Sequence, residues 1–498
     1  MARAVLEAAL QGRHLLVEAG TGVGKSLAYL VPLLMWALPE GRRIVVSTYT
    51  KTLQEQLTKK DLPFLRDKLG MDFSFALHMG SQNYLCQRRL ARMAQMGLFE
   101  DIEEVREFQA ILEWALTTET GLLTELPFEP SPSVWREVSR EPDRCMGRKC
   151  PFYERCFYYR SRRRLEKAEV IVVNHSLFFA DLVAERGVLP EYDAVVFDEA
   201  HTLEDVATKY FGLEVANSQI RYLLREVYDP SKGRGLLMEV SELAPARREA
   251  SDLVSEIRAL SEEVFERASK ALGESTARRL PRGALKSGLL WERLIDLARF
   301  LKGLMAMVGD EETAVELRSL AERAESFAKT LEVIDDQPWE EWVYYAEREE
   351  GARATRVYVK ASPIVVAEEL RRNIFEAVRT VILTSATLAT AGSFEFVKER
   401  LGINEAEELI LGSPFDYERR VLLYIAIDLP DPSEDLKGFN REAAKRVREI
   451  VEIVRGGVFV LVTSHSAVFE ICEELYGAVE GVRVLKQGDK PRYKLLEE

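Results

Sequence analysis

The sequence is poor in cysteine, in long apolar runs and in positive charge. Its 498 residues include only five cysteines, too few for a disulfide-rich secreted scaffold. The longest apolar run, residues 28–38, spans eleven residues and contains a proline, whereas a membrane-spanning helix needs about 20. The first residues show no basic segment followed by an apolar core, so no signal peptide is predicted. We therefore expect a cytoplasmic protein without a membrane partner.

Charge is distributed unevenly along the chain. The net charge is −14, which excludes a surface that is basic all over, as in proteins coated with nucleic acid. Residues 140–167 nevertheless hold ten Lys and Arg against four Asp and Glu. The length suggests three or four domains, and a hydrophobic content of 47% is enough for several cores.

Patterns typical of buried strands recur in separate parts of the chain. They are continuous apolar runs, as in the parallel sheets of α/β proteins. The predicted strands are residues 14–18, 43–48, 169–174, 194–199, 379–385 and 456–464. Residues 206–375 are predicted to be mostly helical. Apolar residues recur there at intervals of three and four, for example Leu253, Ile257, Leu260 and Val264, which indicates the core of a helical bundle.

A glycine-rich turn follows the first predicted strand and precedes an apolar helix. It reads AGTGVGKS and comprises Ala19, Gly20, Thr21, Gly22, Val23, Gly24, Lys25 and Ser26. In such a loop the backbone N–H groups and the helix N-terminus bind phosphate oxygens. Lys25 is expected to contact the β- and γ-phosphates of ATP, and the Ser26 hydroxyl is expected to bind Mg²⁺.

Two further strand ends complete a nucleotide site. The run AVVFDEAH ends in Asp198 and Glu199, followed by His201. We expect Asp198 to hold Mg²⁺ and Glu199 to polarise the attacking water. The run TSATL contains Thr384, Ser385 and Thr387, whose hydroxyls are predicted to couple the nucleotide to another site.

Four of the five cysteines lie within one segment. Cys86, Cys145, Cys150 and Cys156 suit either a 4Fe–4S cluster or a tetrahedral zinc ion, and the spacing alone leaves both open, as well as unligated thiols. Cys472 lies apart from them and is expected to be a buried structural residue.

The motifs AGTGVGKS, DEAH and TSATL, in this order, resemble those of superfamily 2 helicases. The segments GSQNYLC, CPFYERC, VVNHSLFFADL, SPFDY and LVTSHS further resemble the iron–sulfur helicases of the XPD/DinG family, in its bacterial DinG/YoaA branch. The resemblance implies an α/β fold, namely a RecA-like P-loop motor domain with an inserted iron–sulfur domain and an inserted helical Arch domain, followed by an incomplete second RecA-like domain. The implied domains are 1–85, 166–205 and 376–418 for the first motor, 86–165 for the iron–sulfur domain, 206–375 for the Arch and 419–498 for the start of the second motor.

The same resemblance implies an activity. It implies an ATP-dependent DNA helicase that uses Mg²⁺ and a 4Fe–4S cluster held by Cys86, Cys145, Cys150 and Cys156. Family members move 5′→3′ on single-stranded DNA, so forked or flapped duplexes, a role in DNA repair and replication, and a nucleoid-associated location are expected.

Two groups of residues are candidates for DNA contact. Thr48, Thr50 and Gln54 follow the second strand and resemble the first DNA-contacting motif of the family. Arg162, Arg163 and Arg164 lie in the basic stretch, where Tyr and Phe residues interleave with Arg, as in proteins that hold single strands. The alternative interpretation is a solvated basic face with its aromatic residues packed inside.

The sequence departs from the family pattern in one important respect. The Gln-x-x-Gly-Arg-x-x-Arg motif that supplies arginine fingers is not found, and the family's adenine-reading segment would precede Met1. An arginine finger accelerates hydrolysis by about 10³–10⁵. We therefore expect a truncated chain or a second polypeptide that completes the motor. Two alternative functions follow: an ATP- and DNA-binding half-motor without helicase activity, and an RNA-directed ATPase.

Overall fold

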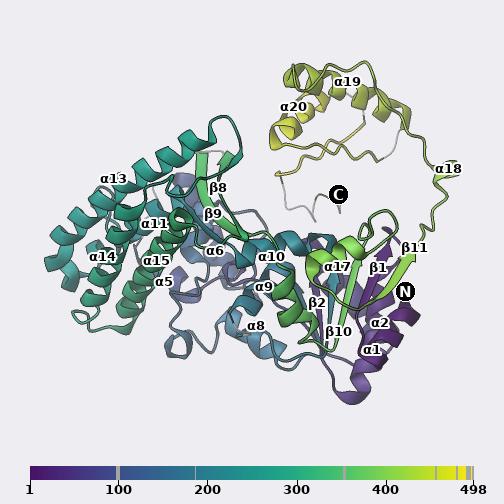
Figure 1. Ribbon diagram of the computed structural model, residues 1–498, viewed down its shortest axis with the longest axis horizontal. Helices are drawn as coiled ribbons and strands as arrows, with labels where there is room; N and C mark the ends of the chain where they lie inside the picture. Colours follow the sequence, from purple (N-terminus) through teal and green to yellow (C-terminus); the bar gives the residue numbers. More distant parts are fainter. Residues whose placement is uncertain are drawn as a thin grey trace. The chain divides into compact units, whose positions relative to one another are not determined.

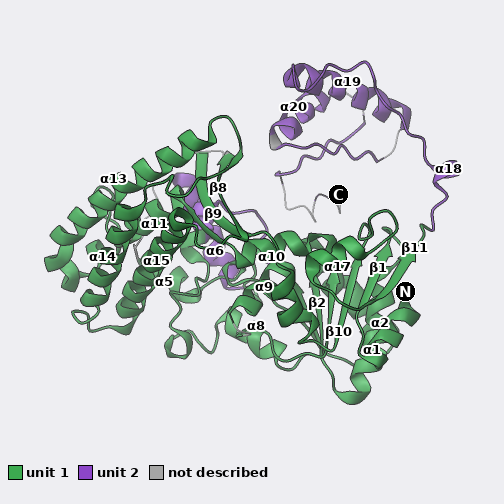
Figure 2. Cartoon of the chain, viewed as in Figure 1, with its two compact units in different colours: residues 1–98, 118–123, 136–413 green, residues 99–117, 124–135, 414–498 purple. Residues whose placement is uncertain are grey.

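The computed structural model describes residues 1–96, 101–184, 187–350, 355–454, 457–477, 481–489 and 495. The chain divides into two compact units, which are described separately (Figure 2). The first comprises residues 1–98, 118–123 and 136–413, and the second comprises residues 99–117, 124–135 and 414–498.

A seven-stranded sheet forms the centre of the first unit (Figure 1). Its spatial order is β11-β1-β10-β5-β2-β4-β3, and all neighbouring strands are parallel. The strands are β1 (Leu15–Ala19), β2 (Ile44–Thr48), β3 (Phe75–Leu77), β4 (Val170–Asn174), β5 (Ala194–Asp198), β10 (Thr380–Ser385) and β11 (Glu407–Leu411). The prediction of a parallel α/β sheet is thereby confirmed.

Helices cover both faces of this sheet because its strands are apolar on both sides. Leu15 and Val17 of β1 pack on one face and Leu16 packs on the other. Helices α1 (Ala2–Gln11), α2 (Lys25–Ala37) and α4 (Leu62–Lys68) supply apolar residues to the first face. The opposite face is covered by α9 (His175–Val183), α10 (Leu203–Phe211), α16 (Ala367–Leu370) and α17 (Glu395–Leu401).

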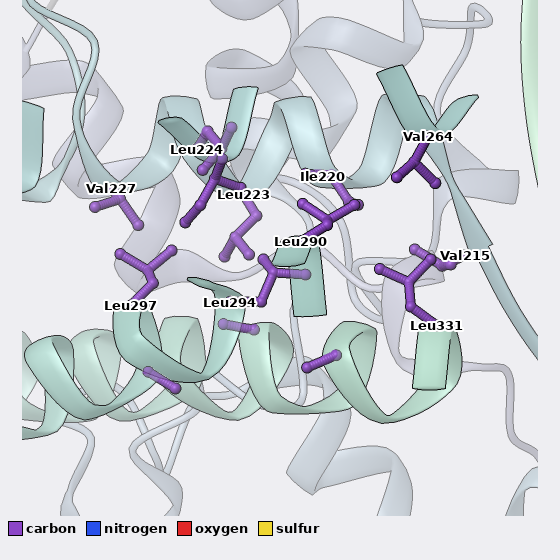
Figure 3. Packing of buried hydrophobic residues seen from close by; sticks show 14 of the residues in the cluster. Val215, Ile220, Leu223, Leu224, Val227, Val264, Leu290, Leu294, Leu297 and Leu331 are labelled. Atoms are coloured by element: carbon purple, nitrogen blue, oxygen red, sulfur yellow. The ribbon is translucent and has the colours of Figure 1, made fainter. Parts of the chain in front are cut away.

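A helical insertion with its own core leaves the sheet after α10. Its helices are α11 (Asn217–Val227), α12 (Leu236–Glu239), α13 (Arg247–Leu272), α14 (Gly288–Leu304) and α15 (Glu311–Asp336). Figure 3 shows how Leu290, Leu294 and Leu297 of α14 lie among buried residues of the neighbouring helices. The predicted stripe is found on α13, where Ile257 and Val264 are buried, so the bundle-core prediction is confirmed.

The insertion also contains strands that the sequence analysis missed. A four-stranded antiparallel sheet has the order β6-β9-β8-β7, with β6 (Leu213–Ala216), β7 (Ala277–Arg279), β8 (Trp342–Glu350) and β9 (Thr355–Pro363). The expectation of a mostly helical region is corrected to this extent. Side chains of β9 alternate between buried and accessible, which is the two-residue period of a half-buried strand and was present in the sequence.

The remaining α-helices of the described residues follow β2, lie in the segment that carries the four cysteines, or lie after β11. They are α3 (Lys51–Gln56), α5 (Gln87–Met96), α6 (Ile102–Ala115), α7 (Pro132–Val138), α8 (Phe157–Leu165), α18 (Tyr417–Arg420), α19 (Leu436–Val454) and α20 (His465–Leu475).

The strand predicted at 456–464 is not formed in the described residues 457–464. Phe459 and Leu461 are 80% and 91% exposed there. Because a strand is stabilised by pairing with a neighbour, an apolar run without a neighbouring strand stays extended but unpaired. Residues 414–454, 457–477 and 481–489 contain helices and no strand, and α19 and α20 share a small core of Ala444, Ile471 and Leu475.

Across the described ranges, no helix combines the length and the apolar character that crossing a lipid bilayer would require.

Replacement of Leu290 by Ala tests the core of the insertion. Leu290 is 1% exposed, so the truncation leaves a cavity and should lower the free energy of unfolding by about 2–5 kcal/mol. Its neighbour Leu289 is 48% exposed and provides a matched control, for which a change within about 0.5 kcal/mol is expected. Denaturant unfolding followed by circular dichroism measures both, and equal effects would contradict the packing in Figure 3.

Candidate functional site

Polar residues gather at the edge of the parallel sheet where its strands end. In a parallel sheet all carboxyl ends lie at one edge, which is where ligands bind in open α/β folds. The glycine-rich loop follows β1, Asp198 ends β5, and Thr384 and Ser385 end β10. These three strands are adjacent in the sheet, in the order β1-β10-β5. Segments about 370 residues apart in sequence thus meet at one edge.

The loop after β1 has a backbone that requires glycine. Gly22 and Gly24 have φ angles of 73° and 77°, a left-handed conformation that L side chains rarely adopt. Gly24 precedes α2, whose first residue is Lys25. The free N–H groups at the start of α2 and the loop backbone together provide donors for an anion.

Lys25 and the two carboxylates after β5 lie close to one another. The Lys25 Nζ is 3.9 Å from Glu199 Oε1 and, although buried, has no hydrogen-bond partner. Burial raises the pKa of Asp198 to about 6, while Lys25 acts in the opposite direction. Tyr29 donates a hydrogen bond of 3.4 Å to Asp198 Oδ2. Glu199 has a φ angle of 61°, a strained conformation for a residue with a side chain.

The turn after β10 is attached to both nucleotide motifs. His201 Nδ1 and Ser385 Oγ are hydrogen-bonded at 2.8 Å, and His201 lies 3.5 Å from Glu199 Oε2. On the other side, Glu18 Oε2 accepts hydrogen bonds from the N–H groups of Leu388 and Ala389 at 2.8 and 2.7 Å. The turn therefore bridges the strand that carries the glycine-rich loop and the segment that carries the carboxylates.

Several buried polar atoms at this edge lack a hydrogen-bond partner. They are Lys25 Nζ, Thr48 Oγ1, both polar atoms of the Gln54 amide, His175 Nε2 and Thr384 Oγ1. Leaving such a group unpaired costs about 1–3 kcal/mol, so their concentration indicates a site shaped for a polar ligand. Thr50 differs from them, because its hydroxyl accepts a hydrogen bond from Leu53 N and caps α3.

The four clustered cysteines line one pocket. Cys86, Cys145, Cys150 and Cys156 face it, together with Arg88, Arg140 and Tyr159. Burial raises the pKa of the Cys156 thiol, and the nearby Cys86 adds to this rise. Among the described residues no group of three His, Cys, Asp or Glu is placed to hold a single metal ion. The four thiols around one pocket are a donor set that would suit a 4Fe–4S cluster.

The basic helix α8 keeps most of its aromatic residues inside. Phe157 and Tyr158 are 4% and 6% exposed, so they are not available for stacking on a base. Arg162 donates to the Gly187 carbonyl, Arg163 bonds to Glu154, and Arg164 is exposed. For Phe157 and Tyr158, the interpretation that the aromatic residues pack inside is therefore the one that applies.

Cys472 lies on α20, far in sequence from the four cysteines of the pocket, and is half-buried.

Comparison with known proteins gives consistent matches. A family model described as DEAD/DEAH box helicase matches residues 1–96, and the DEAD_2 model matches residues 146–220. ATP-dependent DNA helicase YoaA of Escherichia coli K12 is 31% identical over 504 residues, covering 100% of this chain and 76% of YoaA. The chain belongs to the DinG/YoaA family of helicases. ATP-dependent helicase DinG of Mycobacterium tuberculosis H37Rv is 32% identical over 527 residues, covering 100% of this chain and 75% of DinG.

A solved structure supports the fold of this DinG/YoaA family member. An XPD helicase structure aligns with a TM-score of 0.51 at 16% identity, covering 100% of this chain and 76% of that one. At this identity the likeness concerns the fold alone. The predicted membership of the XPD/DinG family is confirmed.

Two residues at the sheet edge of this family member were missed in the sequence. Glu18 precedes the glycine-rich loop, and its role is visible only through its bonds to residues 370 positions away. His175 is 1% exposed and shares a hydrogen bond of 2.7 Å with Ser47 Oγ. A histidine directly after a buried strand, in VVNHS, was the available signal.

Replacement of His175 by Gln tests the burial of this imidazole. Burial lowers its pKa to about 4, whereas the unfolded chain has a value near 6.5. Between these values the unfolded state binds the extra proton, so the stability contributed by neutral His175 is present above pH 6.5 and is lost as the pH falls towards 4. The variant should show a shallower loss of unfolding free energy over this window.

The measurement is the denaturation midpoint of both proteins between pH 4 and pH 7.5. Parallel curves would show that His175 does not titrate differently in the folded state.

Proposed function

We propose that this protein is an ATP-dependent DNA helicase that couples ATP hydrolysis to movement along single-stranded DNA and to duplex unwinding. One observation carries the proposal: Lys25, Asp198, Glu199 and Ser385 at the end of β10 meet at one sheet edge, with the Lys25 ammonium buried, 3.9 Å from Glu199 Oε1 and without a hydrogen-bond partner. The YoaA relatives, which are named DNA helicases, supply the class of nucleic acid.

The roles of the residues follow from their placement. The backbone of residues 19–24 and the start of α2 bind phosphate oxygens, and Lys25 contacts the β- and γ-phosphates. Ser26 and Asp198 hold Mg²⁺, which neutralises phosphate charge when bound. Glu199 orients the attacking water and accepts its proton, since a carboxylate is the available base beside Lys25.

The turn after β10 carries the coupling. Thr384 and Ser385 end β10 and Thr387 lies in the turn after it, and Ser385 Oγ accepts a hydrogen bond from Thr387 N at 3.2 Å. Because His201 and Glu18 hold the turn from two sides, loss of the γ-phosphate near Glu199 changes the position that the turn prefers. Thr50, which caps α3 and is partly exposed, is the candidate DNA contact at this edge, while Thr48 and Gln54 are fully buried and position the segment that carries it.

ATP hydrolysis with and without single-stranded DNA tests the proposal. The unmodified chain should show DNA-stimulated turnover, and Lys25→Ala should lose it by on the order of 10²- to 10³-fold, because a charge that stabilises the transition state is removed. Lys329→Ala, an exposed lysine on α15, is the matched control and should leave turnover unchanged. Turnover that survives in Lys25→Ala would refute the assigned site.

We further propose that Cys86, Cys145, Cys150 and Cys156 hold a 4Fe–4S cluster. The support is the donor set: four thiols around one pocket, with arginine side chains that would balance the charge of the thiolates. The cluster would stabilise the fold of the lobe between α5 and α8.

Iron content and visible absorbance of the anaerobically purified protein test this assignment. We expect about four iron atoms per chain, a strong loss of iron in Cys150→Ser, and no loss in Cys472→Ser, since Cys472 is outside the pocket. One zinc per chain without iron would contradict the cluster.

The direction and the cellular role are proposed from the family. Movement is assigned as 5′→3′, on forked or flapped duplexes in DNA repair and replication near the nucleoid, with Arg162, Arg163 and Arg164 as further DNA contacts. The exposed side chain of Arg164 supports only this last part. The direction is read from whether a 5′ or a 3′ single-stranded tail permits unwinding.

A half-motor that binds ATP and DNA without turnover is the second candidate function. It is favoured by one observation: the described residues between 414 and 489 form no strand and therefore no second sheet. Nucleotide binding without DNA-stimulated hydrolysis would support it, and a second polypeptide would then be required for movement.

A further inference from the structure

The end of β7 and the loop after it carry positive charges without ion-pair partners in the described ranges. Arg278, Arg279, Arg282 and Lys286 fall within nine residues, and all four are exposed. None of them forms an ion pair with any other residue in the described ranges, whereas Arg267 and Arg293 of the same insertion do. We call residues 278–286 the β7 basic loop. These four cations lie within nine residues of a chain whose net charge is −14.

The β7 basic loop is held in one conformation. The Asp335 carboxylate accepts hydrogen bonds from Leu285 N at 3.1 Å, from Ser287 N at 2.5 Å and from Ser287 Oγ at 2.7 Å. Lys286 has a φ angle of 50°, one of few non-glycine residues in the left-handed region. Backbone strain of this kind persists only where surrounding contacts enforce it and is common at binding sites.

Two tryptophans, of which Trp339 is exposed and Trp342 is partly buried, belong to a segment that is hydrogen-bonded to this loop. The rings of Trp339 and Trp342 have centroids 4.5 Å apart, and Trp339 is 42% exposed. The Gln337 side chain donates to Leu280 O at 2.9 Å, and Leu280 N donates to Tyr344 O at 2.8 Å. Tyr344 OH in turn bonds to the backbone of Trp339. These bonds fasten the segment that carries the tryptophans to the β7 basic loop.

We propose that the β7 basic loop and Trp339 form a binding site for single-stranded DNA on the helical insertion. Arg279, Arg282 and Lys286 contact phosphates, and one base stacks on the exposed ring of Trp339. Cations beside an accessible aromatic ring are the combination that binds single strands without sequence preference. An acidic protein would satisfy the charges, but the chemistry of base stacking accounts for the exposed indole as well. The inference rests on the proposed DNA-directed function and adds a contact outside the motor.

Charge reversal and removal of the ring test this site. In Arg279→Glu/Arg282→Glu, the affinity for a fluorescent single-stranded oligonucleotide should fall about tenfold or more, and the slope of log affinity against log salt should fall by about 1.4, two contacts at about 0.7 each. Trp339→Ala should weaken binding about tenfold with little change in the salt slope, and Trp339→Tyr should restore most of it. Arg278 is left intact because it donates to Ala271 O.

Matched controls separate this site from general electrostatics. Arg248→Glu/Arg318→Glu reverses two exposed, unpaired arginines of the same insertion that have no aromatic neighbour in the site, and should change affinity less than twofold. The hydrolysis of ATP without DNA should be unchanged in all variants, since none of these residues lies at the sheet edge. This activity also shows that each variant is folded.

The outcomes distinguish this inference from the proposed function. If the unmodified protein binds no single-stranded DNA, the proposed function fails. If it binds and the Arg279→Glu/Arg282→Glu and Trp339→Ala variants bind equally well, only the further site is refuted. An effect as large in the control as in the test variant would also refute it. Unchanged DNA affinity with loss of binding to a polyglutamate peptide would assign the surface to an acidic protein instead.

Discussion

The parallel arrangement of the central sheet is the constraint on which the site depends. Because every strand runs in the same direction, the glycine-rich loop, the Asp198–Glu199 pair and the turn after β10 must all lie at one edge. The connections between parallel strands cross over the sheet, so long insertions leave and return without disturbing its register. The cysteine lobe and the helical insertion are both accommodated in this way, between β3 and β4 and between β5 and β10.

The residues at this sheet edge lower the stability of the folded protein. Thr48 Oγ1 and the Gln54 amide are buried without hydrogen-bond partners, and Glu199 adopts a left-handed backbone. Such features each cost on the order of 1–3 kcal/mol and must be offset by burial elsewhere. The offset is available because both faces of the sheet are apolar and fully covered. Function at this edge and stability in the sheet are therefore linked.

Ion pairs join the cysteine lobe to the helical insertion. Arg92 bonds to Glu239 and Glu316, while Arg323 of α15 donates to Glu141 at 2.6 Å and also bonds to Asp143. Several of these groups are largely buried, where charges are screened little by salt and where loss of one partner leaves the other uncompensated. These ion pairs therefore connect residues beside the cysteine pocket to α15.

Local patterns in the sequence determined the elements whose signals lie within a few residues. Three strands, at residues 14–18, 43–48 and 194–199, were predictable because continuous apolar runs form strands buried on both faces. The glycine-rich loop was predictable because its Gly-Lys-Ser turn is suited to binding phosphate. Only the tertiary structure decided which partners these elements meet: Glu18 reaches Leu388 and Ala389 across about 370 residues. For the same reason the apolar run at 457–464 was predicted as a strand and forms none, since strand formation depends on a neighbour that local sequence does not encode.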